Sequence, residues 1–265
     1  MKAEYRKLPE KNALSATDLP QSAADRGRII AMWSGPRNLS TAMMRSFSSR
    51  ADCTVMDEPF YAAFLAATGI DHPMRAETIA SQPTDPDSVV RQCLEAPARH
   101  AIVYQKHMTH HMLDGFDLTW VKQVTNVFLI REPERVLASY ANKRETVSAE
   151  DIGVRRQWEL FEHFGALTGQ RPVVIDSAAI RADPEGQLRR LCAAISIAFD
   201  PAMLSWPAGR HDADGVWSAH WYDAVWRSTG FAAAEGAALP ALAPELAAIA
   251  NAARPCYDRM AKFAL

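Results

Sequence analysis

Five short apolar runs recur along the chain, and turns or segments with helical spacing separate them. The runs occupy residues 28–33, 53–56, 101–105, 126–130 and 172–175. Apolar runs of this length that alternate with helices are typical of parallel strands buried on both faces. The alternation therefore predicts the α/β fold class, with a parallel sheet of about five strands flanked by helices.

Helical spacing is clearest between these runs and in the Ala-rich tail. The helical segments are 41–47, 86–96, 134–145, 151–167 and 184–195, and the tail is 239–265. The first residues are polar and include Pro9 and Pro20, which disfavour a stable element. We therefore predict a flexible N-terminal extension over 1–27 and a single α/β domain over 28–265 with a helical C-terminal part.

Charge and cysteine spacing exclude several classes of protein. The chain has a net charge of −2, so it lacks the positive field that attracts nucleic acid or an anionic membrane. No apolar run approaches the roughly 20 residues that cross a bilayer, and the first residues lack the apolar stretch of a secretory signal. The four cysteines are far apart, which argues against a zinc site or a disulfide framework. A cytoplasmic protein with no nucleic-acid or membrane partner is expected.

The turn after the first run has the sequence Trp-Ser-Gly-Pro-Arg-Asn-Leu-Ser-Thr-Ala over 33–42 and leads into a helix. Backbone N–H groups and the helix dipole make such a junction a P-loop-like anion site. It is not a nucleoside-triphosphate P-loop, because that motif needs a Gly-Lys pair where this chain has Leu39 and Ser40. Arg37 supplies the cation instead. The alternative is a plain turn in which Ser40 or Thr41 caps the helix.

A second polar pair follows the fourth run. Arg131 ends the run, Pro133 can open a helix, and Ser139 lies about two helical turns further on. A guanidinium fork and a hydroxyl placed in this way can converge on one phosphate. The alternative is that Arg131 pairs with Glu132 or Glu134 at a solvated helix start.

Three histidines follow the third run. His107 stands nearest its end, where the ligand edge of a parallel sheet lies, and a histidine pKa of about 6.5 suits proton removal at neutral pH. A metal site formed by His107, His110 and His111 is an alternative, which we disfavour because no Cys or carboxylate spacing supports it. His107 is therefore a candidate base, and no metal is expected.

The order of these motifs over residues 29–140 resembles the sulfotransferase superfamily that uses 3′-phosphoadenosine 5′-phosphosulfate (PAPS). The similarity is greatest to divergent bacterial and sulfotransferase-like members, in which arginine often replaces the loop lysine. The resemblance implies that Arg131 and Ser139 hold the 3′-phosphate and that His107 is the catalytic base. It also implies that the 5′-phosphosulfate lies against Arg37, Asn38, Leu39, Ser40 and Thr41.

The chain departs from the family pattern at several positions. Leu39 replaces the loop glycine, and Gln105 stands where cytosolic members have a lysine. The family's late Arg-Lys-Gly nucleotide loop is absent. The residues that could bind the nucleotide in its place lie in the aromatic stretch 210–231. These candidates are Arg210, Gly215, Trp217 and Arg227. The aromatic side chains of the stretch either wall an apolar acceptor, stack on adenine or pack in a core.

By this resemblance the chain is predicted to be an enzyme that moves a sulfuryl group from PAPS, its co-substrate, to a hydroxyl or amine of a small-molecule acceptor. Arg37, with Ser40 and Thr41, would stabilise the phosphate oxygen that leaves, without a metal. His107 is the favoured base. Glu58, after the second run, is the other candidate catalytic residue, and the sequence leaves the choice between them open.

Two other functions stay open. The second run ends in Asp57 and Glu58, which can be read as a magnesium-binding aspartate and a catalytic glutamate of a P-loop-type kinase or hydrolase. A non-catalytic nucleotide-binding protein is the third reading. Segments 60–86 and 144–154 are expected to shape the acceptor pocket, while the acceptor and the oligomeric state are left undetermined.

Overall fold

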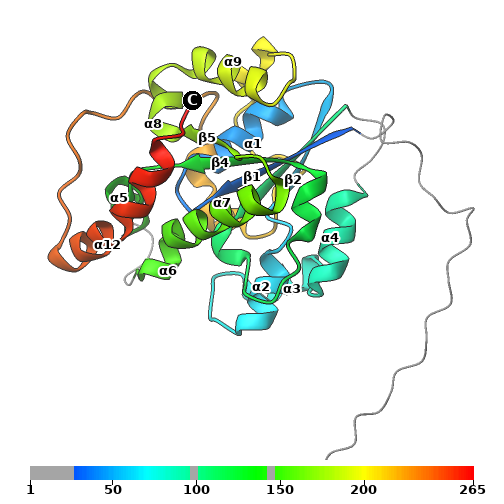
Figure 1. The fold of residues 1–265 in the computed structure, drawn as a ribbon, viewed down its shortest axis with the longest axis horizontal. Helices are drawn as coiled ribbons and strands as arrows, with labels where there is room; N and C mark the ends of the chain where they lie inside the picture. The colour runs from blue at the N-terminus through cyan, green and yellow to red at the C-terminus, as the bar shows by residue number, and fades with distance from the viewer. Residues whose placement is uncertain (1–26, 96–100, 142–146) are drawn as a thin grey trace, which may run out of the picture.

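A computed structural model describes residues 27–95, 101–141 and 147–265. The predicted N-terminal extension lies outside these residues, apart from its last position. The described chain forms a sheet with helices packed on both of its faces (Figure 1).

The sheet consists, in the described ranges, of five parallel strands in the order β2-β3-β1-β4-β5. The strands are β1 (Arg28–Ser34), β2 (Cys53–Asp57), β3 (Ile102–Met108), β4 (Thr125–Ile130) and β5 (Val173–Asp176). Each predicted run forms one strand, so the predicted fold class is confirmed. The chain adds strands first on one side of β1 and then on the other, so the topological switch point, where open α/β sheets bind ligands, lies beside β1.

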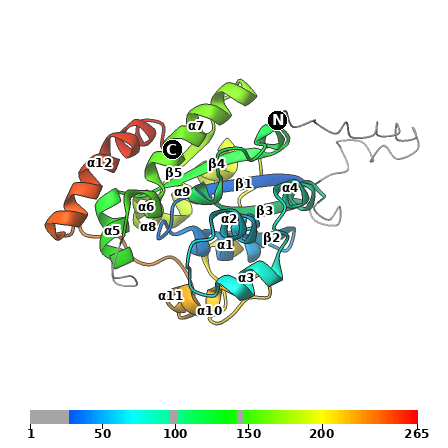
Figure 2. The same ribbon diagram turned by 90° about the horizontal axis from the view of Figure 1, so that it is seen from below.

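Helices on the two faces bury two separate cores. On one face, α1 (Ser40–Ser48), α8 (Ser177–Ala182) and α9 (Pro184–Ala194) cover Ile30 and Met32 of β1. On the other face, the strand side chains Ala31 and Trp33 pack beneath three helices. These are α4 (Pro86–Leu94), α7 (Val154–Thr168) and α12 (Pro244–Ala261). Figure 2 shows α7 and α12 together on one side of the sheet.

Shorter elements complete the fold around the carboxyl edge of the sheet. The helices are α2 (Tyr61–Thr68), α3 (Arg75–Ser81), α5 (Pro133–Ala141), α6 (Ala149–Ile152), α10 (Ser218–Trp221) and α11 (Asp223–Trp226). Single 3₁₀ turns are η1 (Thr109–His111), η2 (Thr119–Gln123) and η3 (Pro201–Leu204). Figure 2 places α10 and α11 on the side of the sheet opposite α7 and α12.

The predicted helices form with two differences. The segment predicted as one helix over 151–167 is divided into α6 and α7, because Gly153 between them has φ 65°, a left-handed conformation. The helix predicted over 134–145 is α5, and residues 142–145 of that prediction lie outside the described residues. α2 and α3 lie where no helix is predicted. None of the helices in the described ranges has the length and apolar character to span a membrane.

Strand β3 extends further than the sequence predicts. Its apolar run ends at Gln105, but pairing with β2 continues to Lys106 and pairing with β1 to Met108, so Lys106 and His107 lie inside the strand. Side chains alternate between the two faces of a strand. Lys106 therefore shares the α1 face with Tyr104, and His107 lies on the opposite face.

Candidate active site at the carboxyl edge of the sheet

A cavity of about 580 Å³ opens beside the carboxyl end of β1. Its wall combines the loop before α1, the ends of β3 and β4, and the late segment 221–232. Every residue predicted to bind the nucleotide lines this cavity, and so does Glu58. They are Arg37, Asn38, Leu39, Ser40, Thr41, Arg131 and Ser139. The structure therefore brings residues more than a hundred positions apart to one site.

The loop before α1 has the conformation of an anion-binding turn. Arg37 and Leu39 have φ values of 60° and 70°, in the left-handed region. Alternation of left- and right-handed residues turns successive N–H groups toward one point, a geometry that binds anions. Leu39 thus adopts the conformation for which the family uses glycine. Leu39 is also the N-cap of α1 and makes no side-chain cap, so the alternative of a Ser40 or Thr41 cap is not observed.

Hydrogen bonds from beneath fix the loop in this shape. Asn38 Nδ2 donates to the carbonyl oxygen of Leu129 in β4 at 3.2 Å, and Arg131 donates to the carbonyl oxygen of Arg37. A Cβ atom at Gly35 would lie 2.5 Å from the carbonyl oxygen of Ile152, so only glycine fits there. These contacts hold the loop in its anion-binding conformation.

Two arginines and a serine meet at the side of the cavity next to this loop. Arg37 Nε donates to Ser139 Oγ at 3.0 Å, and Arg131 contacts the same loop. Burial and the neighbouring charge of Arg131 lower the pKa of Arg37, although a guanidinium keeps its proton. Arg131 does not pair with Glu132 or Glu134, which was the alternative reading of this motif; its carboxylate partner is Glu235. Two close cations of this kind favour a bound anion.

A buried charge cluster forms the floor of the cavity. Lys106 Nζ lies 2.9 Å from Asp57 Oδ1 and 2.6 Å from Glu58 Oε1. The Tyr222 hydroxyl accepts from Lys106 and donates to Asp57. The side chains of Lys106 and Asp57 are 2% and 1% exposed, and that of Glu58 is 10% exposed. The cluster joins β2, β3 and the late segment through charge-assisted hydrogen bonds.

The pKa values of Glu58 and Lys106 are both raised in this cluster. Burial raises the pKa of Glu58, and Lys106 only partly opposes the rise. Burial would lower the pKa of Lys106, but the carboxylates of Asp57 and Glu58 outweigh it and raise this pKa instead. Glu58 also has φ 41°, a strained value for a residue with a Cβ. Glu58 is therefore a carboxylate with raised basicity at the cavity wall.

The structure does not bring His107 to the cavity. Its ring stacks on Trp33 at a centroid distance of 4.4 Å, and its Nε2 lies 3.1 Å from Gln105 Oε1. Burial lowers its pKa to about 3. The expectation that His107 faces the ligand edge is therefore corrected: β3 continues past Gln105, and the alternation of side chains turns His107 into the core between the sheet and η2.

Aromatic and imidazole side chains also line the cavity. His111 stacks on Tyr61 at 4.5 Å, and His72 stacks on Trp221 at 5.5 Å. Burial, followed by neighbouring histidines, lowers the pKa of both His110 and His111, that of His110 to about 4. In the described part of the chain no three His, Cys, Asp or Glu side chains are grouped to hold a metal ion. This part of the cavity wall suits an uncharged or apolar group.

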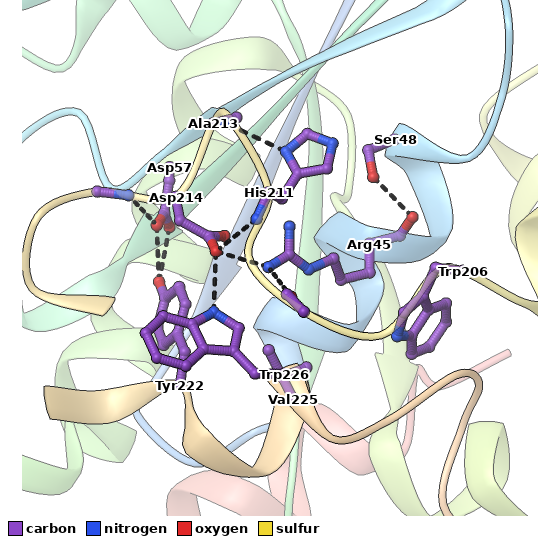
Figure 3. Close-up of polar contacts among 12 residues, drawn as sticks. Arg45, Ser48, Asp57, Trp206, His211, Ala213, Asp214, Tyr222, Val225 and Trp226 are labelled. Carbon is purple, nitrogen blue, oxygen red and sulfur yellow. Dashed lines mark hydrogen bonds and ion pairs between the residues drawn. The ribbon is translucent and has the colours of Figure 1, made fainter. Parts of the chain in front are cut away.

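A buried ion pair anchors the late segment to α1. Arg45 NH2 lies 2.6 Å from Asp214 Oδ2, and the two side chains are 3% and 4% exposed. The same oxygen accepts from Trp226 Nε1 and from the backbone N–H of His211, both at 3.0 Å (Figure 3). This network holds the outer wall of the cavity against the helix that follows the anion-binding loop.

The four residues predicted as possible replacements for the absent nucleotide loop lie in different places. Arg227 lines the cavity, as do Trp221 and Tyr222 of the same stretch. The other three are not in the wall: Trp217 is 1% exposed in a core, Arg210 stacks on Trp226, and the Gly215 N–H donates to Asp57. The aromatic stretch therefore serves both as core and as cavity wall.

Several residues of the site are absent from the predicted set. Lys106 could have been found by extending the strand and following its alternation, since it shares a face with Tyr104. His111 belongs to the histidine group and Tyr222 to the aromatic stretch of the sequence analysis, but neither pattern predicts which of its members face this cavity, because each reaches it through contacts distant in sequence.

An arginine-rich cavity at the carboxyl edge of a parallel sheet defines an α/β protein of the open-sheet class with a ligand site beside its first strand. The family model of the sulfotransferase domain matches residues 27–264, and the chain belongs to this family. This membership supports a sulfotransferase activity. The predicted resemblance to sulfotransferases is thereby confirmed.

One solved structure shares the fold, and two plant proteins are similar in sequence. The sulfotransferase domain from the curacin biosynthetic pathway superposes with a TM-score of 0.51 and 15% identity, over 85% of this chain and 97% of that one. Branched-chain-amino-acid aminotransferase-like proteins 2 and 1 of Arabidopsis thaliana are 35% and 36% identical over 203 residues. That region is 77% of this chain and 36% of each relative, so the chain spans about a third of the length of these curated relatives.

Proposed function

We propose that the chain transfers a sulfuryl group from PAPS to a hydroxyl or amine of a small-molecule acceptor. The observation that carries this proposal is the meeting of the left-handed loop, Arg37, Arg131 and Ser139 at one end of a cavity that has Glu58 at its floor. The loop suits a 5′-phosphosulfate, and Arg131 with Ser139 suits a second phosphate on the same nucleotide. The aromatic part of the cavity wall suits the acceptor.

In the proposed reaction the acceptor oxygen or nitrogen attacks sulfur in line, the bond from sulfur to the bridging phosphate oxygen breaks, and 3′-phosphoadenosine 5′-phosphate leaves. Loop N–H groups, Arg37 and the hydroxyls of Ser40 and Thr41 stabilise the charge that develops on that oxygen. Positioning supplies most of the remaining rate enhancement.

Glu58 is the base in this proposal, because it lines the cavity whereas His107 does not. Lys106 and Tyr222 both contact Oε1 of Glu58, and in the described part of the chain no hydrogen bond falls on Oε2. Oε2 is the atom that takes the acceptor's proton. Burial raises the pKa of Glu58 and brings this pKa closer to the working pH, where a general base is most effective.

Ligand-dependent melting tests the choice of donor. We expect 3′-phosphoadenosine 5′-phosphate, without added metal, to raise Tm by about 5–10 °C at a concentration near 100 times Kd, because it binds only the folded state. ATP with magnesium should give a much smaller shift, since the loop has Arg37 and no Gly-Lys pair. A magnesium-dependent preference for ATP would overturn the proposal in favour of a kinase or hydrolase, and nucleotide binding without sulfuryl transfer to any tested acceptor would favour a binding protein.

Two truncations test the assignment of the 3′-phosphate site. Arg131→Ala should weaken binding of 3′-phosphoadenosine 5′-phosphate by about 1.5–3 kcal/mol, the cost of losing a charge-assisted contact, and Ser139→Ala by less. Adenosine 5′-phosphate, which lacks the 3′-phosphate, should lose far less affinity. Isothermal calorimetry with both nucleotides measures the difference, and equal losses for the two would contradict the assignment.

A further inference from the structure

Two arginines from different strand ends converge on one carboxylate oxygen. Arg131 follows β4 and Arg181 lies in α8 after β5, and both guanidinium groups contact Oε1 of Glu235, Arg181 through NH1 at 2.6 Å. Their side chains are 12% and 18% exposed, and that of Glu235 is 16% exposed. Oε1 of Glu235 therefore marks a partly buried point at which two guanidinium forks reach the same anionic oxygen.

The hydrogen bonds at this point are incomplete. Arg131 Nε and Glu235 Oε2 are buried and have no hydrogen-bond partner in the part of the chain that the structure describes, although Oε2 lies 3.6 Å from Arg135 Nε in an ion pair. A carboxylate offers two acceptor oxygens in a plane, whereas a phosphate offers three in a tetrahedral arrangement. A phosphate at this point could also accept from Arg131 Nε, which the carboxylate leaves unused.

The segment that carries Glu235 is fixed by its backbone and not by this carboxylate alone. Arg181 Nε donates to the carbonyl oxygen of Ala233 at 2.9 Å, and Arg135 NH2 donates to that of Gly236 at 2.6 Å. The residues from Ala232 to Ala243 form no helix or strand. The side chain of Glu235 can therefore leave the arginines while its backbone stays in place.

Resting on the proposed function, we infer that Glu235 competes with the 3′-phosphate for Arg131 and that Arg181 is a second arginine of the 3′-phosphate site. The 3′-phosphate of the nucleotide displaces the carboxylate and takes over its contacts with Arg131 and Arg181. Arg181 thereby supplies a cation that the absent Arg-Lys-Gly loop would otherwise bring. A nucleotide without a 3′-phosphate leaves Glu235 where it is.

Calorimetry with two nucleotides on three variants tests this inference. Glu235→Gln removes the competing charge and should tighten binding of 3′-phosphoadenosine 5′-phosphate about ten-fold, with little change for adenosine 5′-phosphate. Arg181→Gln should weaken binding of the first nucleotide about ten-fold and leave the second nearly unchanged. Glu185→Gln is the matched control, because Glu185 pairs with Arg189 on exposed α9 and its change adds the same charge to the protein.

Each outcome separates the inference from the function on which it rests. If the natural protein does not distinguish the two nucleotides, the proposed function is wrong. If it prefers the 3′-phosphorylated nucleotide but Glu235→Gln binds it no better than Glu185→Gln does, Glu235 is not a competitor. Unchanged affinity in Arg181→Gln would remove Arg181 from the site, and a melting curve for each variant establishes that it is folded.

Discussion

Replacing Glu58 by glutamine should lower kcat by roughly 10²–10⁴-fold, the range expected when a general base is lost. Glutamine keeps the shape and the hydrogen bond of Glu58 to Lys106 but has no basic oxygen. Affinity for 3′-phosphoadenosine 5′-phosphate should be nearly unchanged, because the residues proposed to hold its phosphates are Arg37, Ser40, Thr41, Arg131 and Ser139 and do not include Glu58. The measurement is steady-state kinetics with an accepted hydroxyl or amine compound, together with nucleotide calorimetry.

The pH profile gives an independent readout of the same residue. A base acts only when it is deprotonated, and burial raises the pKa of Glu58 above the ordinary glutamate value of about 4.3. The kcat/KM of the natural enzyme should therefore rise with pH through this raised pKa and then level off. The rise should be absent from the residual activity of Glu58→Gln.

His107→Phe is the matched control for this assignment. Phenylalanine preserves the ring that stacks on Trp33, so turnover should stay close to that of the natural protein. If His107→Phe abolished turnover and Glu58→Gln retained it, the base would be His107, and the cavity would have to rearrange to expose it.

Replacing Lys106 by methionine should lower the free energy of unfolding by about 3–5 kcal/mol, the cost of removing one partner from a buried ion pair. Methionine fills most of the lysine volume but leaves the carboxylates of Asp57 and Glu58 buried together without a cation. Urea unfolding followed by circular dichroism measures the loss. Lys122→Met, at an exposed position of η2, is the control and should change stability little.

The loss in Lys106→Met should depend on pH. Burial raises the folded-state pKa of Glu58, and removing Nζ takes away the charge that opposes this rise, so the folded variant binds a proton that the unfolded chain releases. The variant should therefore regain stability as the pH falls and lose it as the pH rises through the raised pKa of Glu58. A loss below about 1 kcal/mol at neutral pH would mean that water already solvates the cluster.

The fold and half of the site could be predicted because their signals are local. Buried parallel strands appear as apolar runs, and the loop with Arg37 appears as a turn between such a run and a helix. Arg131 and Ser139 follow from one strand end and one helix. For these residues the neighbouring sequence is enough to predict where in the fold the residue lies.

The other half depends on contacts that no local pattern encodes. The register of β3 against β1 decides which of Lys106 and His107 faces the cavity, because a shift of one residue would exchange the faces of the two side chains. Tyr222 lines the cavity and Glu235 contacts Arg131, and both residues belong to the late segment of the chain. Their positions are set by partners more than a hundred residues away, Asp57 and Arg131.

The ion pair between Arg45 and Asp214 has a consequence for how the outer wall of the cavity exchanges its amide hydrogens. Irregular segments usually open locally at little cost and exchange rapidly. Here the segment from His211 to Trp226 cannot detach unless a buried guanidinium and a buried carboxylate are separated and left unpaired. We therefore expect the amide hydrogens of this segment to exchange together with those of α1 and more slowly than those of an unanchored loop.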